Sequence, residues 1–253
     1  MGLWTLEHFL AIVPAFLIFA GIAVLLGFLL KNHEKTKIWI LRGFAILIIA
    51  LEIAKQTISL IKGYDLYHLP FHYCSLFIYL LPFHAFASGK FKKYIDGITF
   101  TACTSLFLFF MIIPTILYPA GAITAYFENF FNFHTVTFHH LVVLYLFLAI
   151  AFRSFKLVIK RDFPICAIIL SGYVIVATIL SYALDVNFQN LKKCNMELLE
   201  TNLRIPLNNS IGWLGQGIYV FIIFLGTTLF GFLSYYLISL FYKYVAKGKA
   251  TVK

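Results

Sequence analysis

Seven apolar segments, each long enough to cross a bilayer as a helix, follow one another along this chain. A helix needs about 20 mainly apolar residues to cross the hydrocarbon core of a membrane. The chain is 62 % hydrophobic and only 12 % charged, whereas a soluble domain carries roughly 25 % charged residues. We therefore expect an all-α fold, a polytopic membrane helix bundle with seven transmembrane helices in one integral membrane domain, residues 1–253. The expected spans are residues 8–30, 38–61, 66–88, 96–117, 133–152, 163–183 and 211–242.

Lysine and arginine are divided unequally between the two sides of this predicted bundle. With alternating spans, fourteen of them fall on the side of the C-terminus and four on the side of the N-terminus. Loops with an excess of Lys and Arg stay in the cytoplasm, so we predict an N-terminus outside and a cytoplasmic C-terminus. The fourteen are Lys31, Lys35, Lys37, Lys90, Lys92, Lys93, Arg153, Lys156, Lys160, Arg161, Lys243, Lys247, Lys249 and Lys253.

The net charge of +10 therefore does not indicate a nucleic-acid partner. Basic cytoplasmic loops attract anionic lipid, and we expect that partner and no nucleic acid. The chain has no Gly-rich phosphate-binding loop, no GxSxG and no HExxH, so we expect no cofactor and no metal. The four cysteines form no CxxC pair, and only Cys194 falls in a long loop, which argues against a disulfide framework.

Histidines and a cysteine gather where the third and fifth spans begin. The third span starts with HLPFHYCSLF, residues 68–77, and the fifth with FNFHTVTFHH, residues 131–140. At a rise of 1.5 Å per residue, Cys74 lies ~6 Å inside the membrane, and His139 and His140 lie ~9 Å inside. His134 is at the rim. A cysteine and a histidine pair from different helices thus reach a similar depth.

Other polar residues are predicted at the same end of the bundle. Glu52 and Lys55 are three residues apart in the second span, so they share a helix face and can pair. Ionisable residues inside a bilayer usually face the protein interior or a watery cavity. We expect one polar cavity that opens toward the outer leaflet, with only scattered polar residues, such as His84, in the inner half. Its other contributors are Gln56, Tyr182, Asp185, Asn187, Asn208 and Asn209.

This arrangement suggests covalent catalysis by a cysteine and a histidine. A thiolate attacks an acyl carbonyl to form a thioester, while an imidazole acts as general base and then acid. On a helix, Cys74 is roughly 200° around from His72, so we expect the base to come from the fifth span. His139 is the first choice and His134 the second. A packed, inert Cys74 is the simpler reading of the same residue.

Three other interpretations remain open from the residues. His68 and His72 are four apart and could hold zinc with a fifth-span histidine. Seven spans with Glu52, Lys55 and several histidines could form a transporter or a proton path, although we find no inverted repeat. The protein could also be a structural or partner-binding membrane protein.

The sequence resembles a known family at four places. HLPFHYCSL, residues 68–76, is similar to the H-x-P-[LF]-H-x-C-S element of the YwaF-like integral membrane proteins of bacteria, a family that includes the animal transmembrane protein 164. GAITA, FHHLVVLYL and DVNFQNL, at residues 121–125, 138–146 and 185–191, resemble its later elements in the same order. The resemblance covers residues 38–240. His140 stands where the family commonly has glycine.

The resemblance implies an activity and a location. The animal member is a lipid acyltransferase that uses a cysteine thioester and a histidine to acylate an ether lysophospholipid. Hydrolases of the same fold use threonine in place of the cysteine. Carried over, the nucleophile falls on Cys74 and the base on His139 or His134, in a bacterial cell membrane, with a phospholipid or lysophospholipid as substrate. The residues expected to bind or position this substrate are His68, His72, Ser75, His140, Asn187, Glu52 and Lys55.

Overall fold

The computed structural model describes residues 4–114, 117–118 and 121–247, and within these residues every regular element is a helix. The predicted all-α class is therefore confirmed. Six of the helices are long and apolar enough to cross a membrane. They are α1 (Leu6–Leu29), α2 (Glu34–Ile61), α4 (Gly89–Ile112), α5 (Phe130–Ala151), α6 (Ile159–Ala183) and α9 (Trp213–Lys247), the last spanning up to Tyr244.

The third predicted span differs from the expectation. Residues 66–88 were expected to form one transmembrane helix, but α3 covers only Leu76–Phe86. A helix of this length extends about 16 Å. Two short 3-10 turns, η1 (Leu66–His68) and η2 (Tyr73–Ser75), precede it. The Asp65 carboxylate accepts a hydrogen bond of 2.8 Å from the Tyr67 N–H and starts the first turn. Cys74 and its neighbours therefore lie on turns before the helix.

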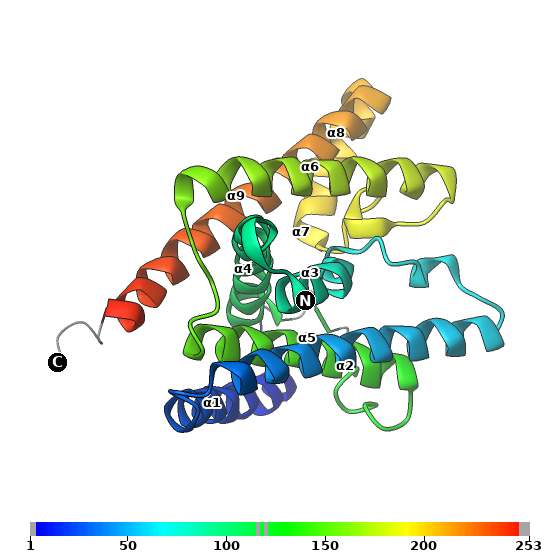
Figure 1. Cartoon of the computed structure of the whole chain (residues 1–253). Coiled ribbons are helices and arrows are strands. Elements are labelled where there is room, and N and C mark those ends of the chain that lie inside the picture. Colours follow the sequence, from blue (N-terminus) through cyan, green and yellow to red (C-terminus); the bar gives the residue numbers. More distant parts are fainter. Residues whose placement is uncertain (1–3, 115–116, 119–120, 248–253) are drawn as a thin grey trace.

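The short α3 lies among the other helices near the middle of the bundle (Figure 1), with one face buried and Tyr79, Phe83 and Phe86 exposed on the other. Non-helical backbone at membrane depth is tolerated where protein buries it. Helix α3 packs against α2 and α4, and α4 is itself mostly buried. By contrast, α1, α2, α6 and α9 bury only a small share of their residues and expose many apolar side chains, as lipid-facing helices do.

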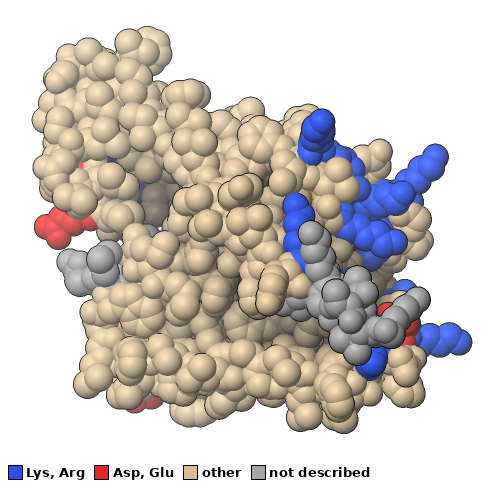
Figure 2. Space-filling view, turned by 90° about the vertical axis from the view of Figure 1, so that its left-hand side faces the viewer, with Lys and Arg blue, Asp and Glu red and all other residues tan. Residues whose placement is uncertain are grey.

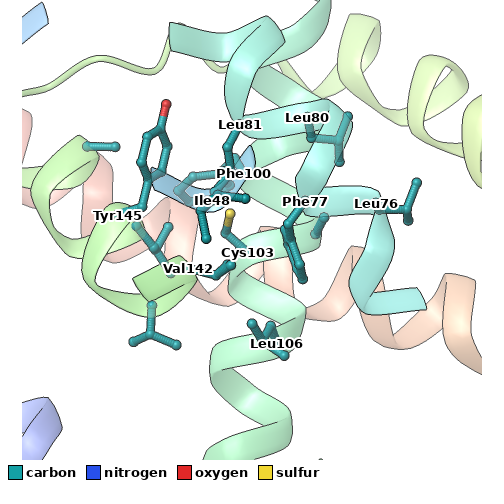
Figure 3. Packing of buried hydrophobic residues seen from close by; sticks show 14 of the residues in the cluster. Ile48, Leu76, Phe77, Leu80, Leu81, Phe100, Cys103, Leu106, Val142 and Tyr145 are labelled. Carbon is teal, nitrogen blue, oxygen red and sulfur yellow. The ribbon is translucent and has the colours of Figure 1, made fainter. Parts of the chain in front are cut away.

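The core of the bundle is apolar and closely packed. Figure 3 shows side chains of α3 meeting those of α4, with residues of α2 and α5 beside them. Packing of this kind excludes water from the middle of the bundle. The labelled residues are Ile48, Leu76, Phe77, Leu80, Leu81, Phe100, Cys103, Leu106, Val142 and Tyr145, all of which are buried.

The chain alternates between two ends of this bundle. We call the end that holds the last turns of α2, the segment 62–75, the start of α5 and the end of α6 the cysteine end. The opposite end, where α2, α4 and α6 begin and α9 finishes, is the basic end. Figure 2 faces the side of the molecule on which α9 finishes, and its Lys and Arg side chains gather on one part of that surface. Which end faces the cytoplasm stays a prediction.

Three small elements join α6 to α9 at the cysteine end. They are η4 (Phe188–Asn190), α7 (Glu197–Leu199) and η5 (Glu200–Arg204), and the helix α8 (Ile205–Ile211) follows them directly. Gly212, with φ of +58°, turns the chain from α8 into α9. A Cβ on Gly215 would lie 2.2 Å from the Leu207 carbonyl oxygen, so glycine is required where α8 crosses the start of α9.

Candidate functional site

Side chains of α2 hold the segment that carries Cys74. The Gln56 amide donates hydrogen bonds of 2.6 Å to Glu52 Oε1 and 2.7 Å to the His68 carbonyl. The Tyr64 hydroxyl donates to Gln56 Oε1 at 2.6 Å. Ser59 Oγ is hydrogen-bonded to His68 Nδ1 at 2.7 Å. Gln56 was among the polar residues expected at this end, whereas Ser59, two turns beyond Glu52 on the same face of α2, was not and could have been found by the same spacing rule.

Helix α6 and the loop after it hold the same segment from the other side. The Tyr173 hydroxyl is within hydrogen-bond distance of the carbonyl oxygens of Pro70, at 3.1 Å, and His72, at 2.8 Å. The Gln189 amide donates to the Phe71 carbonyl at 2.9 Å. These contacts satisfy the carbonyls of Pro70 and Phe71, and they add a second donor at the His72 carbonyl, which also accepts from the Ser75 N–H at 2.9 Å. Non-helical backbone inside a membrane needs such partners. Sequence reasoning did not single out Tyr173.

A buried charged cluster lies beside this segment. Lys55 Nζ is 2.7 Å from Glu52 Oε1, and His134 Nε2 of α5 is 3.5 Å from Glu52 Oε2. Glu52 and His134 are 7 % and 6 % exposed. A buried ion pair is tolerated only when geometry and hydrogen bonds offset its desolvation. Here the Glu52 carboxylate contacts the Lys55 ammonium and the Gln56 amide of its own helix, α2. It also lies near the His134 imidazole of α5.

Cys74 is half-buried and lies within electrostatic range of both Lys55 and Glu52. Its side chain also packs against the apolar core, as the inert reading expects. Ser75, the next residue, is buried. The structure thus places Cys74 in the electrostatic neighbourhood of Glu52 and Lys55, while no hydrogen bond among the described residues joins the thiol to a histidine of α5.

The three histidines of α5 face different surroundings. His134 meets Glu52. His139 is buried against the rings of Phe110, Tyr118 and Phe138, and neither of its ring nitrogens has a hydrogen-bond partner among the described residues. The ring of His140 is hydrogen-bonded to the Tyr118 hydroxyl at 2.8 Å and lies near Phe16 of α1. His140 therefore belongs to the contact between α1 and α5 and lies away from the Glu52 cluster.

His68 and His72 are ordered by local contacts. The His68 ring stacks on Phe131 with a centroid distance of 4.4 Å. The His72 Nε2–H donates to the Tyr67 carbonyl at 3.0 Å, and its ring lies 5.2 Å from that of Phe188. The described residues contain no group of three His, Cys, Asp or Glu side chains that could hold a metal ion.

Asn187 shapes a loop of its own. Its Oδ1 accepts hydrogen bonds from the backbone N–H groups of Lys192, at 3.0 Å, and Lys193, at 3.1 Å, and its amide donates to the Lys193 carbonyl at 2.8 Å. These contacts close the turn after η4. Asn187 therefore holds this loop, and its side-chain hydrogen bonds all lie within the loop.

A family model matches residues 3–239 of the chain, and its description is "TMEM164 family". The chain belongs to the TMEM164 family. With its apolar helices, it is a multi-pass integral membrane protein of that family. Neither the curated proteins nor the solved structures contain a match to the chain. The matched range includes every candidate residue discussed above.

A second buried polar cluster lies at the basic end of this TMEM164-family bundle, where we expected only scattered polar residues. His84 Nδ1 of α3 is hydrogen-bonded to the Tyr145 hydroxyl at 2.5 Å, and His84 Nε2 is 3.4 Å from Asp96 Oδ1 of α4. Asp96 also accepts from the Lys156 N–H at 2.9 Å. Asp162 of α6 accepts from the Tyr235 hydroxyl at 2.8 Å. Two buried carboxylates therefore tie the α5–α6 loop and α9 to the bundle.

Proposed function

We propose that this protein is a cysteine-dependent lipid acyltransferase or acyl hydrolase in which Cys74 carries the acyl group as a thioester. The observation that supports this most is the position of the thiol. A half-buried cysteine at one end of a membrane bundle lies within electrostatic range of Lys55 and of the Glu52 carboxylate, and that carboxylate in turn has His134 Nε2 at 3.5 Å. A nucleophile, a base and a group that orients the base are the parts that covalent acyl transfer requires.

The chemistry has two steps. A histidine of α5 takes the proton of the Cys74 thiol, and the thiolate adds to the carbonyl of a lipid ester. The C–O bond then breaks, and the imidazolium returns its proton to the leaving alcohol. In the second step the histidine deprotonates the hydroxyl of a lysophospholipid or a water. This oxygen attacks the thioester, the C–S bond breaks, and the sulfur regains a proton.

His134 is the base that the charged cluster favours. Its Nε2 lies near the Glu52 carboxylate, and such a carboxylate orients an imidazole and stabilises its protonated form. His134 and His139 are equally buried and neither makes a hydrogen bond through Nε2 among the described residues, but His139, the first choice from the sequence, is bordered by aromatic rings where His134 has a carboxylate 3.5 Å away. Burial of that kind disfavours a positive charge. We therefore assign the base to His134 and keep His139 as the alternative.

The substrate follows from the surroundings. The apolar, lipid-facing helices around the site support membrane lipids, a phospholipid or lysophospholipid, as the proposed acyl donor and acceptor. The bacterial members of the resembling family make a bacterial cell membrane the proposed location. The basic end of the bundle would lie against anionic lipid.

The test uses purified protein in mild detergent with a phospholipid. Intact mass is recorded before and after neutral hydroxylamine, which cleaves thioesters. We expect an acyl adduct that maps to Cys74, disappears with hydroxylamine and is absent from Cys74→Ala. Cys103→Ala, which removes another free thiol in the core, is the matched control and should keep the adduct. Unchanged lipid turnover in Cys74→Ala would rule the proposal out.

A transport function has weaker support. Polar clusters at both ends could suggest a path across the membrane. However, the interior between them is filled by side chains such as Ile48, Phe77 and Phe100, each fully buried. Flux in proteoliposomes that depends on Glu52 and not on Cys74 would favour transport.

A further inference from the structure

A cleft of about 380 Å³ lies at the cysteine end, outside the cluster around Cys74. It is bounded by the end of α6, the loop after η4, α8 and the start of α9. Its polar and aromatic lining comes from Tyr182, Lys192, Arg204, Asn208, Trp213 and Gln216. The turn 188–191 separates it from the Cys74 segment, because Phe188 packs on His72 while the Leu191 carbonyl accepts a hydrogen bond of 2.9 Å from Gln216.

Two cations face this cleft, and they are held differently. Arg204 is paired with Glu200 by two nitrogen–oxygen contacts and is mostly buried. Lys192 is paired with Asp185, whose side chain is 92 % exposed. An ion pair with so exposed a partner contributes little stability. Lys192 can therefore exchange this carboxylate for another anion at little cost.

The cleft also contains an acceptor without a donor. Gln216 Oε1 receives hydrogen bonds from Asn208 Nδ2, at 2.8 Å, and Arg204, at 3.3 Å. Asn208 Oδ1 is buried and has no hydrogen-bond partner among the described residues. This oxygen is closed off from solvent, so the charged group that a ligand in the cleft can reach is the Lys192 ammonium.

Trp213 places this cleft at the level of lipid headgroups. It is 86 % exposed, and it stands at the first residue of the spanning helix α9. Tryptophan is enriched where helices leave the hydrocarbon core. The neighbouring apolar side chains of Ile211 and Leu214 are also exposed. The anion that reaches this cleft most directly is the phosphate of a lipid in the surrounding bilayer.

We propose that the cleft between α6, α8 and α9 binds the headgroup of a membrane phospholipid, with Lys192 on the phosphate and the acyl chains against Ile211 and Leu214. This site does not depend on the proposed thioester chemistry, and its test leaves Cys74 untouched. An inorganic phosphate could use the same lysine, but it brings no acyl chains for Ile211 and Leu214.

Trp213 itself reports on the site once the other tryptophans, Trp4 and Trp39, are replaced by phenylalanine. The full-length protein in detergent is titrated with dihexanoyl phosphatidylglycerol below its micelle-forming concentration, and Trp213 fluorescence is recorded. We expect a saturable change, and in Lys192→Gln an affinity weaker by about tenfold, the loss of one charge-assisted hydrogen bond. Lys193→Gln is the matched control, because the exposed Lys193 side chain does not line the cleft, and it should bind normally.

Two further ligands test whether binding requires the phosphate, the acyl chains or both. Dihexanoylglycerol, which has no phosphate, should not saturate the site. Inorganic phosphate should bind more weakly than the lipid. Equal affinity in Lys192→Gln and Lys193→Gln, equal binding of dihexanoylglycerol, or phosphate binding as tight as the lipid would each overturn the proposal.

Discussion

The Nε2 atom of His134 lies 3.5 Å from Oε2 of Glu52, which joins α5 to α2 inside the bundle. The two residues are 82 positions apart in the sequence, and both are almost fully buried. Lys55 occupies the other oxygen of the same carboxylate. Glu52 is therefore the residue on which both the stability and the proposed chemistry of the cysteine end depend.

Replacing Glu52 alone should destabilise the protein more than replacing Glu52 and Lys55 together. Glu52→Leu leaves Lys55 as a buried charge without its partner, which costs about 3–5 kcal/mol. The double variant Glu52→Leu, Lys55→Leu removes both charges and should recover part of this loss. Thermal unfolding midpoints in one detergent measure the difference. If the double variant is destabilised by the sum of the two single-variant losses, Glu52 and Lys55 do not interact as the ion pair in the structure requires.

The histidines of α5 should differ in their effect on acyl transfer. His134→Asn should lower the rate of thioester formation by roughly 10²–10⁴, the usual contribution of a general base. His140→Asn, which alters the contact with Tyr118, should leave the rate near that of the wild type. Single-turnover measurement of the adduct on Cys74 compares them. If His139→Asn greatly lowers the rate of thioester formation and His134→Asn does not, the general base is His139.

Gly97 should not tolerate a methyl group. A Cβ at this position would lie 2.6 Å from Cγ of Asp162, and Asp162 is fixed by Tyr235 and by the Val158 N–H. Gly97→Ala should therefore destabilise the protein by roughly 1–3 kcal/mol, as overpacking usually does. Gly172→Ala in α6 is the control, since a Cβ there meets nothing within 4 Å. An unchanged unfolding temperature in Gly97→Ala would contradict the close contact of α4 with α6.

The loop before α8 should loosen in acid. The hydrogen bond from Arg204 lowers the pKa of Glu200, and Glu200 also accepts from the Cys194 N–H at 2.8 Å. A carboxylate whose pKa is lower in the folded state stabilises that state above its unfolded pKa of about 4.3. This stabilisation is lost as the pH falls through the folded pKa.

Glu200→Gln provides the comparison. The wild type should be more stable than Glu200→Gln at pH 7, and the difference should shrink as the pH falls from about 5 toward 3. Thermal unfolding of both proteins across this range measures it. A difference that stays constant with pH would mean that the Glu200 carboxylate does not contribute through its charge.

Hydropathy and local spacing determined much of this protein from the sequence alone. The apolar segments predicted an all-α membrane protein, because a chain in lipid must satisfy its backbone within helices. The motif around Cys74 indicated the family, and the i, i+3 spacing predicted the pairing of Glu52 with Lys55, which the structure confirms. These signals are local, so they can be read along one segment at a time.

Only the tertiary structure decided how the segments meet. The turns at residues 66–75 could not be separated from a helix by hydropathy, because what stabilises them are contacts to Gln56 and Tyr173 on other helices. The choice of His134 as neighbour of Glu52, and the cluster of His84, Asp96 and Tyr145, likewise depend on which faces of distant helices pack together. Such pairings form because buried polar groups need hydrogen-bond or charged partners, which other helices supply. No local sequence pattern predicts which residues those partners are.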